Sequence, residues 1–290
     1  MTNLIAVDWG TSRFRTFALD ALGAVLDRVS APDGMSTVAA GGFPAVLERH
    51  CGAWMKASPT APVLMAGMVG SRNGWAEAAY APCPASPASV AAAVLRVDAR
   101  VSIVPGVIAR HASGPDVMRG EETLVFGSGV TDGVVCLPGT HSKWAAVEGG
   151  VITDFATFMT GESYALYRET SLLGRLATTP EDPAGFEAGL TAARDAGGLL
   201  NRLFQARARV LDGVMTGASV GPYLSGLLIG TEIEGAFGRY GSVGTVTLVA
   251  DGILAENYAK AFAARGVALR VVTPEAAFLA GLSALARHHR

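Results

Sequence analysis

Short apolar runs separated by turns open the chain. Residues 4–7, 14–19 and 24–29 form three such runs, and a turn at residues 20–23 joins the last two. Close spacing with short turns is typical of antiparallel hairpins, so the pattern predicts three strands. Apolar residues then recur at helical intervals from Phe43 onward, which predicts a helix.

The remainder of the first half alternates between short strands and helices. The pattern predicts strands at residues 62–68 and 101–104, and helices near residues 89–95 and at residues 121–127. An irregular, proline-rich stretch separates the first of these strands from the first of these helices. Alternation of this kind favours an α/β fold.

The opening pattern returns at Gly133. Residues 133–155 contain an apolar run, a turn with glycine and hydroxyl residues, a second run, a Gly-Gly turn and a third run. The matched positions of the two glycine-hydroxyl turns are Gly10 with Gly139, Thr11 with Thr140, Ser12 with Ser142, and Arg13 with Lys143. His141 is the one inserted residue.

The second half continues with helices and strands like the first. Helices are predicted at residues 161–176, 182–194, 199–211, 254–264 and 274–287, and strands at residues 245–250 and 267–272. Duplication on this scale indicates two similar α/β domains that face each other across a cleft. We place them at residues 1–131 and 132–274.

Composition and charge narrow the class of protein. The 290-residue chain is 50% hydrophobic and 17% charged, which is typical of a globular protein with a sizeable core. Its net charge of −2 and the lack of a Lys/Arg run argue against a nucleic-acid partner. Three scattered cysteines without a C-x-x-C pair indicate reduced thiols in the cytoplasm.

Two uncharged stretches were tested as membrane spans. Residues 78–95 and 214–231 are interrupted by proline and glycine, so neither is the continuous apolar helix that a bilayer requires. Asp8 and Arg13 interrupt the first apolar run too early for a signal peptide. We therefore expect a soluble, cytoplasmic protein without a membrane partner.

The glycine-hydroxyl turns suggest a phosphate site. Such a turn exposes several backbone N–H groups on one side, and its hydroxyls add donors for an anion. Asp8, at the end of the first strand, would repel phosphate unless a divalent cation lay between them, so we expect it to anchor Mg²⁺ through water. Two such turns could bind a triphosphate from both sides. Ordinary hairpin turns are the alternative, but recurrence at matching places favours the phosphate site.

Six stretches of the chain resemble motifs of a known superfamily. They are AVDWGTS, MAGMVGSRNGW (65–75), MRGEET (118–123), LPGTHSKW (137–144), TFMTGE (157–162) and YLSGLLIGTE (223–232). The first and fourth resemble the two phosphate motifs of sugar kinases, actins and heat-shock ATPases. Within that superfamily the chain is most similar to the 2-dehydro-3-deoxygalactonokinase family.

The resemblance implies a fold and a reaction. It implies two RNase H-like (actin-like ATPase) domains around a central cleft, each a mixed sheet flanked by helices, with helix 275–290 packing back on the first domain. ATP would lie between the domains, and Mg²⁺-dependent transfer would carry its γ-phosphate to the 6-hydroxyl of a 2-keto-3-deoxy sugar acid. The residues that would bind ATP are Asp8, Gly10, Thr11, Ser12, Gly139, Thr140, His141, Ser142, Lys143, Asp251 and Gly252.

Cationic and acidic candidates complete the expected site. Lys143 is preferred over Arg13 as the cation facing the phosphates, because it belongs to the more specific motif. A sugar-acid carboxylate favours a planar cationic partner, for which Arg72 is the first choice and Arg119 the second. The other expected substrate contacts are Gly70, Ser71 and Glu162.

A general base should accept the proton of the attacking hydroxyl. In related sugar kinases it is an acid before the helix that leads into the second phosphate strand, a region that here offers Asp116, Glu121 and Glu122. We select Glu121, with Asp116 as runner-up. Acids at a helix start also serve the helix dipole alone, so this alternative stays open.

These expectations combine into one function with named rivals. We expect a kinase of 2-dehydro-3-deoxy-D-galactonate that serves galactonate breakdown. Its expected partners are the small molecules ATP and the sugar acid, and a homodimer is a further possibility. The rivals are a kinase of another sugar or keto-deoxy sugar acid, such as the gluconate-derived epimer, and an actin-like or chaperone-like ATPase switch. A sugar sensor without catalysis would need a missing Asp8 or a spoiled turn, and neither is seen.

Overall fold

A computed structural model describes residues 1–241 and 243–289 of the chain. The chain divides into two compact units. The first contains Met1–Val135, Ala145–Phe155 and Val272–Arg290, and the second contains Cys136–Trp144 and Ala156–Val271. The domain boundaries expected from the sequence stay a prediction.

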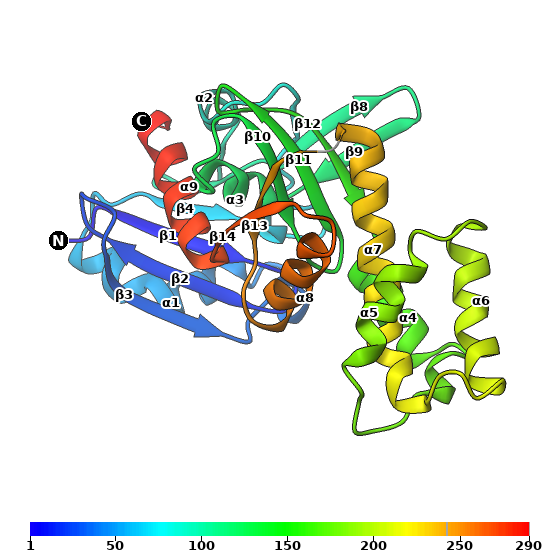
Figure 1. Ribbon diagram of the computed structural model, residues 1–290. Coiled ribbons are helices and arrows are strands. Elements are labelled where there is room, and N and C mark those ends of the chain that lie inside the picture. The colour runs from blue at the N-terminus through cyan, green and yellow to red at the C-terminus, as the bar shows by residue number, and fades with distance from the viewer. Residues whose placement is uncertain (242, 290) are drawn as a thin grey trace. The chain divides into compact units, whose positions relative to one another are not determined.

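The first unit is built on a six-stranded sheet with the order β3-β2-β1-β4-β7-β6 (Figure 1). The strands are β1 (Leu4–Trp9), β2 (Phe14–Leu19), β3 (Val25–Ala31), β4 (Val63–Ala66), β6 (Leu95–Arg96) and β7 (Val101–Ile103). The first three pair antiparallel, as predicted, whereas β4 and β7 continue the sheet parallel to β1. Because β1 has a neighbour on each side and is covered on its faces, its residues are almost continuously apolar.

Helices α1 (Phe43–Ala57), α2 (Pro87–Ala92), α3 (Glu121–Gly127) and α9 (Pro274–His288) also belong to this unit. Helix α9 crosses α3 at two glycines: a Cβ at Gly127 would lie 1.7 Å from the carbonyl oxygen of Ala277, and one at Gly281 would lie 1.8 Å from that of Thr123. These two glycines therefore allow the backbones of α9 and α3 to come into contact.

A small sheet in the first unit was not predicted. It has the order β5-β8-β9, formed by β5 (Ala81–Pro82), β8 (Val107–His111) and β9 (Gly114–Met118). The proline-rich stretch masks β5, because two residues give no alternation to recognise. The helix expected near residues 89–95 instead ends at Ala92, since a capping box between Ser86 and Ser89 begins it earlier and Leu95 pairs in β6.

The second sheet has the order β12-β11-β10-β13-β14. Its strands are β10 (Gly133–Leu137), β11 (Ser142–Glu148), β12 (Val151–Phe158), β13 (Thr245–Val249) and β14 (Ala268–Val272). Three strands in reverse chain order followed by two later ones repeat the order β3-β2-β1-β4-β7 of the first sheet. The duplication predicted from the sequence is therefore present in the strand order.

The second unit carries most of the remaining helices: α4 (Thr160–Glu169), α5 (Ala184–Ala192), α6 (Gly198–Leu211), α7 (Val220–Tyr240) and α8 (Gly252–Ala263). The prediction of one helix over residues 161–176 was wrong at its end. Helix α4 stops at Glu169 and a 3-10 turn follows at Gly174–Leu176, where a Cβ at Gly174 would lie 1.9 Å from the carbonyl oxygen of Arg168.

Helix α7 was not predicted at all, because its glycines and a proline interrupt the helical pattern. Those glycines lie against α5: a Cβ at Gly226 would lie 2.1 Å from the carbonyl oxygen of Phe186, and one at Gly189 of α5 would lie 2.1 Å from that of Tyr223. Tertiary packing thus overrides the low helix propensity of glycine here. Within the described ranges no helix, α7 included, is both long and apolar enough to cross a bilayer.

Candidate functional site

The turn between β1 and β2 presents free backbone donors. Its carbonyl groups are used by the protein, since Gly10 O accepts from Met35 N at 2.9 Å and Thr11 O from Ser36 N at 2.9 Å. Within the described residues the amides of Thr11 and Ser12 have no protein acceptor, and both side chains are exposed. Two adjacent amides and two hydroxyls at one turn suit an anion.

Asp8 lies next to this turn, near the carboxyl end of β1. Arg15 is its cross-strand partner and donates from Nε to Asp8 Oδ2 at 3.0 Å. Gly67 follows β4 with φ +98°, and a Cβ there would lie 2.8 Å from Trp9 O and 3.6 Å from Asp8 Oδ1. A side chain at this position would therefore crowd the carboxylate.

The donor set was tested against Mg²⁺. Among the described residues no three His, Cys, Asp or Glu side chains form a metal-binding group. Mg²⁺ beside a nucleotide usually takes one or two carboxylates together with phosphate oxygens and waters, so a single carboxylate beside an anion-suited turn fits this role. Asp8 is the residue that could supply it.

The start of α3 also lies against Gly67. Gly120 precedes the helix with φ +104°, and a Cβ there would lie 3.2 Å from Gly67 Cα. Glu121 Oε2 accepts from Arg119 N at 2.9 Å, and Glu122 Oε2 accepts from Gly120 N at 2.7 Å. Burial, with the charge of Glu121 as a second cause, raises the pKa of Glu122 to about 8. The Asp8 carboxylate and the residue that precedes α3 thus both lie close to Gly67.

Asp116 lies apart from the helix start, in β9. It pairs across the small sheet with Ala109, and its Oδ1 accepts from Val117 N at 2.8 Å. The two candidate bases therefore differ in position: Glu121 is the first residue of α3, and Asp116 belongs to a strand of a hairpin.

The two candidate arginines have opposite surroundings. The Arg72 side chain is 84% exposed, with Nε 3.6 Å from Glu77 Oε2. The Arg119 guanidinium instead lies 4.3 Å from the centroid of the Tyr80 ring, and its Nη2 donates to Ala78 O at 2.9 Å. Its Nε and Nη1 are buried without an acceptor in the described part of the chain. Buried donors without a partner are costly, which makes Arg119 the arginine that a carboxylate would stabilise.

Gly70 and Ser71 connect Arg119 with the first turn. A Cβ at Gly70 would lie 3.0 Å from Arg119 Nη1, so this glycine allows the guanidinium to approach the backbone. Ser71 Oγ lies 3.3 Å from the sulfur of Met35, whose amide donates to Gly10 O. Ser71 therefore contacts the segment that binds the first turn, and Gly70 lies beside Arg119.

The second turn, between β10 and β11, has the same free donors. Gly139 N donates to Ser142 Oγ at 3.4 Å, and Thr140 O accepts from Glu162 N at 3.0 Å. In the described chain the amides of Thr140 and His141 lack a protein acceptor, as those of the first turn do. His141 Nε2 lies 2.5 Å from Glu162 Oε2, which connects the turn to the first turn of α4.

Lys143 and Arg13, at matching positions of the two turns, differ in exposure. Arg13 is exposed, whereas Lys143 is 4% exposed and its Nζ donates to His141 O at 3.3 Å. The Lys143 ammonium therefore lies directly beneath the second turn. Its expected contact with phosphate stays a prediction.

A cavity of about 480 Å³ in the second unit opens beside this turn. Most of its lining is apolar, and it extends from Gly139 and Thr160 to Ile253, Leu254 and Tyr258 of α8. Asp251 and Gly252 come directly before those α8 residues and are exposed, and the φ of +55° at Gly252 favours glycine. Asp251 and Gly252, which the resemblance implies bind ATP, thus lead into an apolar cavity.

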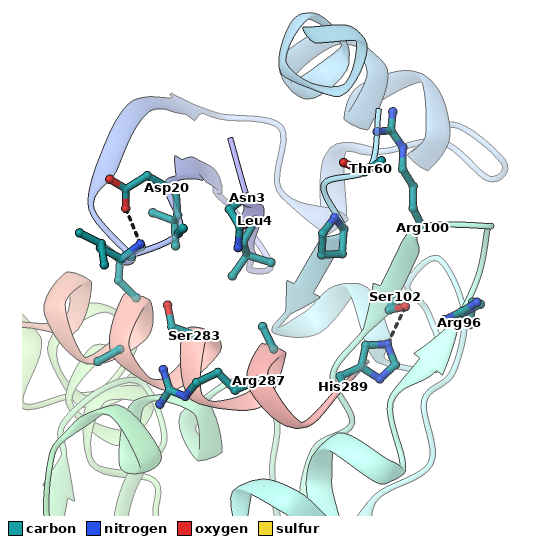
Figure 2. Close-up of a pocket in the computed structure, with 18 of the residues that line it drawn as sticks. Asn3, Leu4, Asp20, Thr60, Arg96, Arg100, Ser102, Ser283, Arg287 and His289 are labelled. Carbon is teal, nitrogen blue, oxygen red and sulfur yellow. Dashed lines mark hydrogen bonds between the residues drawn. The ribbon is translucent and has the colours of Figure 1, made fainter. Parts of the chain in front are cut away.

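A different hollow, of about 990 Å³, lies in the first unit (Figure 2). Asn3, Asp20, Arg96 and Arg287 line it, and His289 Nε2 lies 3.2 Å from Ser102 Oγ within it. It is at the amino-terminal end of β1, whereas the candidate site is at the carboxyl end of that strand. None of the site residues expected from the sequence lines it.

Three residues beside the site had no role assigned from the sequence. Tyr80 contacts Arg119, and Glu232 of α7 contacts Tyr258 of α8. For Glu232 a signal existed, because a lone acid in the apolar stretch 223–233 indicates a buried polar group. Tyr80 gave none, since a tyrosine in a proline-rich segment is ordinarily exposed.

The strand order repeated in both sheets, with an anion-suited turn at corresponding positions, defines the class: an RNase H-like α/β fold, as in sugar kinases and actin-like ATPases. Similarity to known proteins then gives the family. The chain belongs to the 2-keto-3-deoxy-galactonokinase family, whose model matches residues 8–285.

Individual relatives agree with this family. The chain is 40% identical to a probable 2-dehydro-3-deoxygalactonokinase of Rhizobium meliloti (strain 1021), over 97% of this chain and 96% of the relative. It is 34% identical to the 2-dehydro-3-deoxygalactonokinase of Escherichia coli (strain K12), over 97% of each. A crystal structure of a Sinorhizobium meliloti protein assigned the same activity matches with a TM-score of 0.91 and 38% identity, over 98% of each chain.

Proposed function

We propose that the protein transfers the γ-phosphate of ATP to the 6-hydroxyl of 2-dehydro-3-deoxy-D-galactonate, with Mg²⁺, giving the 6-phosphate and ADP. The observation that carries this proposal is similarity along nearly the whole chain to two proteins named for this activity. The cellular setting we propose is the cytoplasm, where galactonate is broken down.

The proposed binding of ATP uses backbone donors and an apolar cavity. The free amides of Thr11 and Ser12, and those of Thr140 and His141, would bind phosphate oxygens. The cavity beside Gly139 has the size and apolar lining that suit an adenine ring. Mg²⁺, anchored through water by Asp8, would supply neutralisation of the phosphate charge.

The proposed handling of the sugar acid uses the residues near Gly67. Arg119 would bind the carboxylate, with Arg72 as the alternative, and so orient the terminal hydroxyl. Glu121 would accept the proton of that hydroxyl, with Asp116 as the alternative. Glu162, paired with His141, is kept as a candidate contact to substrate hydroxyls.

Release of ADP by the purified protein tests the proposal. The assay compares 2-dehydro-3-deoxy-D-galactonate, its gluconate-derived epimer, a neutral sugar and no sugar. We expect release only with keto-deoxy acids, fastest with the galactonate form, and phosphorus NMR should place the phosphate on C6. Equal rates across the panel contradict a sugar-acid kinase, and slow release that no sugar accelerates favours the ATPase switch.

Two further expectations from the sequence stay predictions beside this proposal. Domains at residues 1–131 and 132–274, with the helix at 275–290 packing on the first, would be tested by limited proteolysis. A homodimer would be tested by light scattering of the purified protein.

A further inference from the structure

Glu232 is an acid buried inside the second unit. Its side chain lies on α7, and only 2% of the residue is exposed. Trp144 Nε1 donates to Oε1 at 2.8 Å, and the Tyr258 hydroxyl donates to Oε2 at 2.7 Å. The hydroxyl groups of Thr160 and Ser142 also lie close enough to the carboxyl group to lower its pKa. Polar side chains of α4, β11 and α8 therefore converge on one carboxyl group.

These donors connect Glu232 to the second turn. Ser142 Oγ lies 3.2 Å from the Tyr258 hydroxyl and accepts from Gly139 N at 3.4 Å. Gly139 is the residue immediately before Thr140 and His141, whose amides lack a protein acceptor in the described chain. A substitution at Glu232 would therefore alter the positions of the turn amides through the hydrogen bonds of Tyr258 and Ser142.

Two of these side chains also line the apolar cavity. Thr160 and Tyr258 contribute to its wall, together with Gly139. Helix α8 begins at Gly252 and contains Tyr258. The hydrogen bond between Tyr258 and Ser142 thus connects α8 to the second turn. A group bound in the cavity and an anion bound at the turn would therefore both be positioned by the same hydrogen-bonded side chains.

A buried carboxyl group needs such partners. Burial raises the pKa of Glu232, and the hydrogen bonds from Thr160, Tyr258, Trp144 and Ser142 oppose that shift. A carboxyl group this deep is destabilising unless its oxygens are satisfied, so its energetic effect depends on the hydrogen bonds from Trp144 and Tyr258. Three of these side chains also pack in the core, where Ser142, Trp144 and Tyr258 are at most 1% exposed.

We propose that Glu232 is a positioning residue for the nucleotide phosphates: through Tyr258 and Ser142 it orients the second turn so that its free amides point at a phosphate oxygen. This inference rests on the proposed function, because it assumes that the turn binds nucleotide. Glu232 itself does not touch the nucleotide. Its effect should therefore depend on how many phosphates the ligand carries.

Calorimetric titration with ADP and with adenosine tests this inference. We expect Glu232→Gln and Tyr258→Phe to weaken ADP binding by about 10-fold, which corresponds to the loss of a hydrogen bond to a charged group. Adenosine affinity should stay within about 2-fold of the wild type, because the cavity keeps its shape. Ser142→Ala tests the connection directly should Glu232→Gln fail to fold.

The chain offers two matched controls. Glu234→Gln changes an exposed acid two residues further along α7, where it pairs with Arg265. Tyr240→Phe removes a tyrosine hydroxyl that donates to Trp144 O at 3.2 Å, on the same strand as Ser142. Both controls should bind ADP and adenosine as the wild type does.

The outcomes separate this inference from the proposed function. Equal weakening of ADP and adenosine, or no weakening of ADP by folded Tyr258→Phe and Ser142→Ala, overturns the positioning role of Glu232. A folded wild-type protein that binds neither ligand contradicts the proposed nucleotide site itself. Selective loss of ADP binding in these variants but not in the controls supports the inference.

Discussion

Arg15 and Asp8 lie opposite each other on β2 and β1, and the guanidinium donates from Nε to Asp8 Oδ2 at 3.0 Å. The carboxylate proposed to anchor Mg²⁺ therefore has a cationic neighbour that fixes its orientation. Asp8→Asn removes the charge while keeping a similar shape. We expect the Mg²⁺ concentration for half-maximal activity to rise by about 10- to 100-fold, the usual effect of losing an outer-shell metal contact.

Activity measured against Mg²⁺ concentration checks this expectation. Asp98→Asn is the matched control, because Asp98 is an exposed loop residue whose carboxylate accepts from the neighbouring Ala99 N. An unchanged Mg²⁺ curve for Asp8→Asn, with the fold intact, would show that the carboxylate has another role.

The close contact between α4 and the second turn gives a second prediction. A Cβ at Gly161 would lie 2.5 Å from Gly139 O and 2.9 Å from Thr140 Cα. Gly161→Ala should therefore displace the turn and raise the KM for ATP by about 10-fold, with a cost of about 1–3 kcal/mol in unfolding free energy. Steady-state kinetics and urea denaturation measure the two effects.

Gly238→Ala is the control for that substitution. Gly238 lies in α7, and a Cβ there would have no neighbour within 4 Å. Alanine should stabilise this helix by about 0.5–1 kcal/mol without a change in the KM for ATP. Similar kinetics for both alanine variants would contradict the importance of the contact at Gly161.

The two arginines can be separated by the KM for the sugar acid. Arg119→Lys keeps the charge but loses the planar guanidinium that stacks on Tyr80, so we expect the KM to rise by about 10-fold or more. Arg72→Lys should have a smaller effect, because Arg72 is exposed. If Arg72→Lys has the larger effect instead, Arg72 is the carboxylate partner, as the sequence first suggested.

The general base is tested by two isosteric substitutions. Glu121→Gln should lower kcat by about 10²- to 10⁴-fold, the usual contribution of a general base, and leave the KM for ATP largely unchanged. Asp116→Asn should change kcat little. A large loss of kcat in Asp116→Asn but not in Glu121→Gln would assign the proton transfer to Asp116. If both variants keep the wild-type kcat, neither residue is the general base.

Glu122 predicts a pH dependence of stability. Its pKa in the folded protein is about 8, above the ordinary value of 4.5, so the folded state holds a proton that the unfolded state releases. The stabilisation is fully present below pH 4.5 and is lost as the pH rises towards 8. Glu122→Gln lacks this titration. Between pH 5 and pH 8.5 the unfolding free energy of the wild type should therefore fall relative to that of Glu122→Gln, by a few kcal/mol in order of magnitude.

Urea denaturation at several pH values measures this difference. The comparison with Glu122→Gln separates Glu122 from other titrating groups, including Glu232, whose pKa is also raised by burial. Parallel pH profiles of the two proteins would mean that Glu122 titrates normally in the folded state.

The sequence by itself determined the strands around both turns and the repetition between the halves. Residues 14–19 match β2 as predicted, and the strands predicted from residue 133 onward appear as β10, β11 and β12. These elements were predictable because apolar runs, tight turns and glycine-hydroxyl pairs are local features. The family motifs likewise lie in short contiguous segments, and all of them except the first two residues of AVDWGTS fall within the family match over residues 8–285.

Tertiary structure alone decided the elements and contacts that depend on distant residues. Helix α7 forms despite its glycines because they allow α5 to approach its backbone, and β5 exists only by pairing with β8. The contrast between exposed Arg72 and buried Arg119 arises in the same way, since burial depends on which segments pack together. The sequence shows where a residue type occurs, but the surroundings that shift a pKa or leave a donor unpaired are set by the folded chain.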